Sequence, residues 1–284
     1  MIRRTLPLLG ILLVMMAAMA IVGCNGRKAS PAEEWLDSLS DVPDDSIVSD
    51  DYLADDGYIP RAADDYFDDF FFLFSRSLNA QTSRIKFPLL VVTDGKTDTI
   101  DQKHWHMERF FMEQGYYTLI LDNREQLELM KDTTLSHAVV EKIDLINKRV
   151  RQFVFDRLNG CWVMTQLNNC ALEDIHHAAF LAFYERFATD NDFQMRSLNS
   201  SLQFSGPDAD DDFNTITGQI DASQWSAFKP SLIPHGVIYN ITYGKPAKEG
   251  KDKIFLIRGI ANGLEMDMHF SLKHGEWKLM KFTN

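Results

Sequence analysis

The stretch FDDFFFLF occupies residues 67–74, and the stretch FLAFYERF follows 113 positions later at residues 180–187. In both, aromatic residues recur at positions i, i+3, i+4 and i+7, which places them along one face of an α-helix. The two stretches therefore predict two equivalent amphipathic helices, each with an aromatic face directed at a core. Their common spacing is also the first sign of an internal duplication.

Two further motifs recur in the same order after each helix. The pattern Thr-x2-Ile-Asp-x3-Trp ends at Trp105 and again at Trp225, 120 positions later. The pattern Phe-x4-Gly-x-Trp ends at Trp162 and again at Trp277, 115 positions later. Three matches in one order, separated by small insertions, predict that the chain contains two copies of one folding unit.

Each copy has the same expected order of elements. An aromatic helix is followed by an apolar segment, a short helical turn that holds the repeated tryptophan, and several strands. The strands are expected at 117–121, 138–145, 150–156 and 162–167 in the first copy, and at 237–243, 253–260, 264–272 and 277–282 in the second. In 264–272 apolar and polar residues alternate, as in an antiparallel strand with one buried face. This order predicts an α+β fold.

Aspartates and glycines mark the expected ends of these elements. Asp64 or Asp65 is predicted to cap the first aromatic helix, and Asp174 the second, because a carboxylate accepts hydrogen bonds from free helical N–H groups. Asp101 and Asp221 are predicted to cap the short turns before the repeated tryptophans. The last hairpin of each copy contains the glycine of Gly-x-Trp, a residue that adopts positive φ without strain.

The N-terminus has the features of an export signal. A basic start is followed by the apolar residues 6–22, and the run ends in Ile21-Val22-Gly23-Cys24. A cysteine directly after a small residue resembles the lipobox of bacterial lipoproteins, with Ile21 where the usual box has leucine. The resemblance implies that residues 1–23 are a signal peptide and that Cys24 carries the lipid. A transmembrane helix is the alternative, because the apolar run is close to the ~18 residues that such a helix needs.

Most of the negative charge lies in one segment. The chain has a net charge of −12, and between Glu33 and Asp69 there are 14 acidic residues and one basic residue. Residues 24–63 are therefore predicted to be an acidic, disordered tether between the lipid and the folded units. The remaining chain is nearly neutral and has no basic stripe, which argues against a nucleic-acid partner.

The order of elements and the closing Gly-x-Trp hairpin resemble the cone fold of nuclear transport factor 2-like, or cystatin-like, domains. A lipobox followed by two such copies is similar to a family of exported Gram-negative lipoproteins whose domain has no assigned function. The resemblance implies two tandem cone-shaped domains, 64–170 and 171–284, each a helix packed on a curved antiparallel sheet. It carries over no catalytic residues.

No motif for catalysis, phosphate binding or zinc is present in the sequence, so no catalytic residue, cofactor or metal is expected. Some enzymes with this fold use polar residues in the concave pocket, and the corresponding candidates here are Tyr117, Tyr239 and Tyr243. A buried tyrosine more often packs in a core with its hydroxyl at the edge.

The histidine pairs are not expected to bind metal. His104 and His106 point apart if their segment is helical and share a face only if it is extended. His177 is expected at the surface where the second aromatic helix begins. Cys161 and Cys170 flank a predicted strand that holds them apart, so both are expected to be free thiols.

These observations predict a lipid-anchored cell-envelope protein that acts as a non-enzymatic binding or interaction module. Asn25 after Cys24 resembles the sorting signal of outer-membrane lipoproteins. Both the periplasmic face and the outer surface of that membrane are compatible with this signal. The expected partners are the membrane, through Cys24, and an envelope protein, a glycan or a small apolar ligand. The alternative is an enzyme, a hydrolase or isomerase, that uses the concave pocket of one cone.

Overall fold

The computed structural model describes residues 57–208, 211–246 and 248–283. The first repeat contains these elements: η1 (Arg61–Asp65), α2 (Phe67–Ser75), α3 (Leu78–Ser83), β1 (Ile85–Thr93), β2 (Lys96–Ile100), η2 (Gln102–His104), β3 (Tyr116–Leu121), η3 (Arg124–Lys131), β4 (His137–Asp144), β5 (Arg149–Leu158) and β6 (Cys161–Ala171). The second repeat contains these: η4 (Leu172–Asp174), α4 (Ala178–Thr189), α5 (Asn191–Arg196), β7 (Leu198–Asp208), β8 (Asp211–Asp221), η5 (Ala222–Gln224), α6 (Trp225–Phe228), β9 (Val237–Tyr243), β10 (Asp252–Gly259), β11 (Glu265–Lys273) and β12 (Glu276–Thr283). The elements of the second repeat follow the order of the first, apart from η3 and α6. The mixed α+β fold is confirmed.

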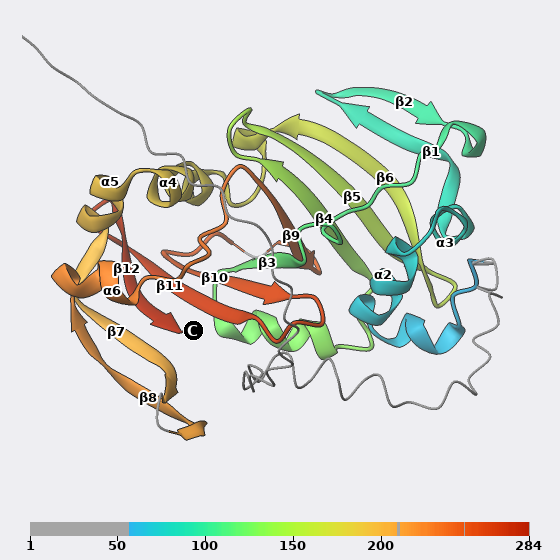
Figure 1. The fold of residues 1–284 in the computed structure, drawn as a ribbon. Coiled ribbons are helices and arrows are strands. Elements are labelled where there is room, and N and C mark those ends of the chain that lie inside the picture. Colours follow the sequence, from blue (N-terminus) through green and yellow to red (C-terminus); the bar gives the residue numbers. More distant parts are fainter. Residues whose placement is uncertain (1–56, 209–210, 247, 284) are drawn as a thin grey trace, which may run out of the picture. The chain divides into compact units, whose positions relative to one another are not determined.

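The strands form one sheet in which the two repeats exchange a strand. The order is β2-β1-β6-β5-β4-β9-β3-β10-β11-β12-β7-β8. We call the six strands from β2 to β9 the first half-sheet, and the six from β3 to β8 the second half-sheet. β3 belongs to the first repeat but pairs with β10, whereas β9 belongs to the second repeat but pairs with β4. β3 and β9 meet at Thr118 and Asn240 in the middle of the sheet (Figure 1).

The two predicted aromatic helices are present, and each covers a core. Phe67, Phe70, Phe71 and Phe74 of α2 are at most 2% exposed. In α4, Phe180, Tyr184 and Phe187 are fully buried, and Phe183 is partly buried. Full burial of a large apolar side chain contributes about 1.5–3 kcal/mol, so these faces are a main reason why each helix docks on its half-sheet.

The duplication extends to individual hydrogen bonds. Trp105 Nε1 donates to Gln81 Oε1 over 3.1 Å, and Trp225 Nε1 donates to Gln194 Oε1 over 2.8 Å. Both glutamines are buried, one in α3 and the other in α5. The repeated tryptophans therefore tie each short turn to the second helix of its own repeat.

The predicted caps are only partly correct. Asp221 caps η5 by accepting from Ser223 N, whereas Asp101 makes no such bond at the start of η2. Asp64, Asp65 and Asp174 were the wrong choices for the aromatic helices, whose N-cap residues are Tyr66 and His177. The carboxylate of Asp64 is instead used in a tertiary contact that is described below.

Several sequence predictions concern residues that come before, or at, the first described residue, Gly57. Cys24 and the chain up to residue 56 fall outside the described residues. Ile59 and Ala63, which both precede residue 64, are buried in the first core. Among the described residues, no helix combines the length and the apolar character that a membrane span requires.

Candidate functional site

The candidate functional site consists of the polar side chains at the ends of the two exchanged strands. Tyr243 is the last residue of β9, and Asp122 directly follows β3. Because each strand has crossed into the other half-sheet, both side chains meet residues of the opposite repeat. Elsewhere the buried side chains are mainly apolar, apart from polar groups such as Glu141 and Asn240, which are hydrogen-bonded to each other. Polar groups gathered in such surroundings are the first candidates for chemistry or for recognition.

The three tyrosines proposed from sequence lie in one core. Tyr117, Tyr239 and Tyr243 are 4–6% exposed, and all pack in the cluster around α2. The sequence assigns Tyr239 and Tyr243 to the second repeat, and only the exchange of β9 brings them beside Tyr117. Phe111 stacks on Tyr117 at 5.0 Å and meets Tyr239 edge-on at 6.0 Å, so an aromatic ring fills the space between them.

Tyr243 ties the end of β9 to helix α2. Its hydroxyl donates to Asp68 Oδ1 over 2.6 Å. Burial raises the pKa of Asp68, against the hydrogen bond from Tyr243 and the charge of Arg258. Burial and then the charge of Asp68 raise the pKa of Tyr243 well above its ordinary value, and the same two causes raise the pKa of Tyr117 to about 12. At neutral pH both hydroxyls therefore stay protonated and are not phenolate nucleophiles.

Aromatic side chains fill the space between helix and sheet in both halves. In the first, Phe67 meets the rings of Phe155 and Trp162 at 5.4 and 5.0 Å. In the second, Phe180 packs at 5.3 Å against both Phe270 and Trp277. The predicted apolar stripes thus occupy the regions in which a concave pocket was considered.

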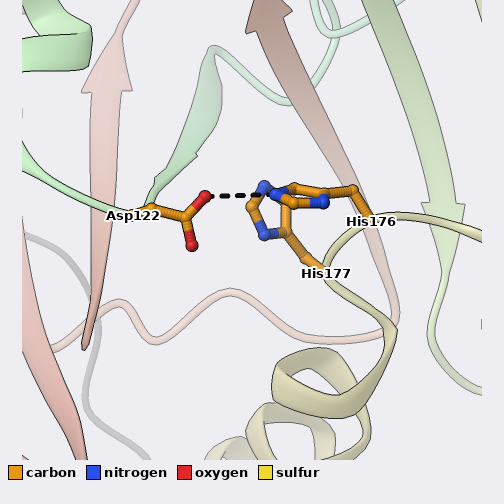
Figure 2. Close-up of side chains that lie close together, drawn as sticks. All are labelled: Asp122, His176 and His177. Atoms are coloured by element: carbon orange, nitrogen blue, oxygen red, sulfur yellow. Dashed lines mark hydrogen bonds and ion pairs between the residues drawn. The ribbon is translucent and has the colours of Figure 1, made fainter. Parts of the chain in front are cut away.

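A second polar cluster lies at the end of β3. Asp122, His176 and His177 offer one oxygen and two nitrogen ligand atoms that lie within 4.8 Å of one another (Figure 2). His176 Nε2 is 3.1 Å from Asp122 Oδ2. The histidines come directly before α4 of the second repeat, whereas Asp122 follows a strand of the first. The cluster therefore exists only because β3 crosses into the second half-sheet.

A lysine completes this cluster. Lys253 of β10 is fully buried, and its Nζ donates to Asp122 Oδ1 over 2.6 Å. The same Nζ lies 3.0 Å from Nδ1 of His177, and Glu249 Oε1 is 3.4 Å away. The backbone N–H of Gly250 also donates to Asp122 Oδ1, over 2.9 Å.

The electrostatics of the cluster follow from these contacts. Burial favours the neutral form of Asp122, but the hydrogen bonds from Lys253, Gly250 and His176 outweigh it and lower its pKa to about 2. Burial, and then the charge of Lys253, lower the pKa of His177 to about 3. At neutral pH His177 is thus uncharged, and its Nδ1 accepts a proton of the Lys253 ammonium group. A carboxylate, an ammonium group and a neutral imidazole form one satisfied network.

The ligand types of this cluster suit a transition metal, but the position of Lys253 does not. A metal ion held by Asp122 and His177 requires the space that the ammonium group occupies, and like charges at such short distances repel strongly. The cluster therefore fits an internal electrostatic tie between the two repeats better than a metal centre.

Sequence reasoning found only part of this cluster. The adjacent His176 and His177 were considered, but the expected surface position of His177 was wrong, since it is 3% exposed. Asp122 and Lys253 lie far from the histidines in sequence, and no spacing pattern could link them. His104 and His106 are exposed on either side of the buried Trp105. Cys161 and Cys170 are free thiols near opposite ends of β6.

Comparisons with known proteins agree with this architecture. Residues 47–284 match the model of the family described as "Domain of unknown function (DUF4348)". An NTF2-like protein from Bacteroides fragilis NCTC 9343 has 35% sequence identity to the chain. Its crystal structure superposes on the chain with a TM-score of 0.71. The match covers 80% of this chain and 98% of that one. No curated protein matches the chain.

The family match spans most of the sequence, and the solved structure shares more than a third of its residues with the chain over nearly its whole length. The aromatic helices and the eight strands predicted from sequence occur in the expected order, and the structure adds the hairpins β1–β2 and β7–β8. The chain therefore belongs to the DUF4348 family of domains of unknown function, and its fold is NTF2-like.

Proposed function

We propose that the chain is a lipid-anchored protein of the cell envelope that acts as a non-enzymatic binding module. In this proposal Cys24 carries the lipid, the acidic segment after it is a spacer, and the folded part engages an envelope protein, a glycan or a small apolar ligand. The folded part corresponds to two cones that have exchanged their third strands. The mirrored order of strands on either side of β9 and β3 supports this description.

The observation that carries the proposal is the filling of both helix–sheet interiors. Phe70, Phe74, Phe180 and Phe187 are fully buried, and the candidate tyrosines are packed among such rings. A catalytic cone needs open space beside its polar groups for a substrate, whereas a cone with a filled interior can bind a partner only through its outer surfaces. The raised pKa values of Tyr117 and Tyr243 point the same way, because they keep both hydroxyls protonated.

The anchor is tested by fractionation of a Gram-negative host that expresses the full chain. The native chain is expected in the membrane fraction after an alkaline wash, since several acyl chains together give stable attachment. Cys24→Ala is expected to move it to the soluble fraction. Cys161→Ala, which removes a different thiol, is the matched control and is expected to stay bound. Retention of Cys24→Ala in the membrane would support the transmembrane alternative and contradict a lipid anchor.

The binding role is tested by chemical crosslinking in the same cells. A non-enzymatic module is expected to give a reproducible crosslinked species in its native location. Turnover of a substrate by the purified chain, abolished by Tyr243→Phe, would instead establish the enzyme alternative.

A further inference from the structure

The duplication creates two equivalent surfaces, one in each half, and among the described residues a chain segment covers only the first. Each surface lies where the second helix of a repeat meets the start of its last strand. In the first half, Met164 N donates to Arg84 O over 2.8 Å, and in the second Leu279 N donates to Ser197 O over the same distance. The backbones of the two surfaces are thus held in the same way.

In the first half, residues 57–65 cover this surface. Ile59 is 5% exposed and Asp64 is 2% exposed. Asp64 Oδ1 accepts from the backbone N–H of Trp162 over 2.8 Å, and its carboxylate pairs with Arg84 at 2.8 Å. Arg84 also donates to Ile59 O over 3.2 Å. The segment is therefore held by one aliphatic side chain and, five residues later, by one buried carboxylate, and the side chain of Arg157 also donates to the backbone oxygens of Asp64 and Asp65.

In the second half, the corresponding segment takes another path. The residues before α4 form the connection from β6, and Leu172 and Ile175 are buried in the second core. The equivalent surface is left as a hollow of about 540 Å³. The residues that line it and matter here are Phe183, Phe193, Arg196, Glu276, Trp277 and Lys278.

The hollow keeps one of the groups that bind Asp64 in the first half, the backbone N–H of the repeated tryptophan, whereas Ser197 stands where the first half has Arg84. Leu272 and Trp277 are paired on β11 and β12 as Arg157 and Trp162 are on β5 and β6. Leu272 N donates to Lys251 O, just as Arg157 N donates to Ser136 O. The N–H groups of equivalent residues in the two hairpins therefore point to the same side of their strands. The amide of Trp277 therefore occupies the position of the amide that donates to Asp64.

The charges and rings around the hollow suit an acidic, partly apolar segment. Arg196 is exposed at its rim, and Lys278 lies beside it with its Nζ bonded to Arg196 O at 2.8 Å. Glu276, 3.0 Å from Lys278, is the acidic residue among those that line the hollow. Phe193 stands where the first half has the small Ala80, and it adds a partly buried ring for an aliphatic side chain.

We propose that this hollow binds an extended acidic peptide segment of a partner protein. The segment presents an aliphatic residue to Phe193 and Trp277, and a carboxylate that accepts from the backbone N–H of Trp277 and pairs with Arg196 or Lys278. Residues 57–65 of the first half are the internal template for this mode of binding. The inference deepens the binding role proposed above and rests on it.

The probe is a fluorescent peptide with the sequence of residues 57–65, added to the full chain in detergent. We expect saturable binding that weakens about tenfold for Arg196→Glu, because the charge that faces the carboxylate is reversed. A peptide that carries Asp64→Asn is expected to bind about tenfold more weakly as well. Arg109→Glu makes the same charge change at an exposed site far from the hollow in sequence and is the matched control, with unchanged affinity.

The position of the probe is fixed by a photoreactive group in place of Ile59. Crosslinks to the segments 183–197 or 275–278 are expected. Crosslinks to residues 79–84 would show that the peptide displaces residues 57–65 from the first half, which overturns the proposal. Absence of binding, or equal binding to Arg196→Glu, overturns it as well.

Crosslinking in cells separates this inference from the proposed function. If the native chain and Arg196→Glu give the same crosslinked species, the binding role stands and the hollow is not its site. If neither gives one, the binding role itself fails.

Discussion

The two exchanged strands end in comparable places but are held by different chemistry. At the end of β9, the hydroxyl of Tyr243 donates to Asp68 in the first turn of α2. At the end of β3, the carboxylate of Asp122 meets Lys253 and the two histidines before α4. Each tie joins the two repeats across the exchange. The duplication has thus kept the backbone arrangement and changed the side chains that hold it.

The two ties differ in how far they depend on charge. A tyrosine–carboxylate bond stays satisfied whether or not the carboxylate is ionised. The cluster around Lys253 needs a carboxylate, an ammonium group and a neutral imidazole together. Breaking the cluster around Lys253 is therefore expected to lower the free energy of unfolding more than breaking the Tyr243–Asp68 bond, and the contribution of the cluster should depend more on pH.

The largest effect is expected from Lys253→Met. The substitution leaves Asp122 buried without its cationic partner, so the free energy of unfolding should fall by about 3–5 kcal/mol. Urea unfolding followed by tryptophan fluorescence measures this change. Lys251→Met removes an exposed lysine two residues away and should alter stability by less than about 0.5 kcal/mol.

The double variant Asp122→Leu with Lys253→Met sharpens this test. With both charges removed, much of the lost stability should return, because replacing a whole buried ion pair by apolar groups is often close to neutral. A loss below about 1 kcal/mol for Lys253→Met alone would contradict the role of the lysine as the centre of the tie.

A smaller effect is expected from Tyr243→Phe. The ring and its packing are kept, and only the hydroxyl that donates to Asp68 is lost. The carboxylate remains partly exposed and can protonate, so the free energy of unfolding should fall by about 1–2 kcal/mol. The same urea titration measures it, with the exposed Tyr66→Phe as control. A loss as large as that of Lys253→Met would reverse the ranking of the two ties.

The prediction from sequence was best where the determinants are local. The periodic aromatic residues located α2 and α4, and the alternation in 264–272 located β11. The turns before Trp162 and Trp277 contain glycines with φ of 78° and 85°, as their expected positions in hairpins require. Each of these features depends on residues that lie within one element or one turn.

The exchange of β3 and β9 could not be predicted in this way. Both strands are short and apolar, YYTLIL and VIYNITY, so either fits beside β4 or beside β10. The choice depends on tertiary contacts such as those of Asp122 and Tyr243. For the same reason the sequence divided the three tyrosines between two repeats, and it did not connect Asp122 with Lys253. Asp64 was assigned to a helix cap because its tertiary partners, Arg84 and Trp162, are distant in sequence.

The smallest effect concerns the pH dependence of the second tie. Burial and the charge of Lys253 lower the pKa of His177 from 6.5 to about 3. The folded chain therefore keeps this side chain neutral at pH 6, whereas the unfolded chain protonates it. A proton bound only by the unfolded state favours unfolding, so the free energy of unfolding falls as the pH falls from 7 toward 3. Between pH 7 and pH 6 this one group lowers it by about 0.7 kcal/mol.

Asp122 does not obscure this change. Its pKa is about 2 in the folded chain, so it stays ionised between pH 7 and pH 6, and its titration lowers the free energy of unfolding only below about pH 4. The measurement is the difference in unfolding free energy between pH 7 and pH 6 for the native chain and for His177→Gln. The glutamine cannot titrate, so the difference should shrink by about 0.7 kcal/mol. His104→Gln removes an exposed histidine and should leave the difference as it is in the native chain. An unchanged difference in His177→Gln would mean that His177 is protonated alike in the folded and unfolded chain, and the network around Lys253 would then have to hold two adjacent positive charges.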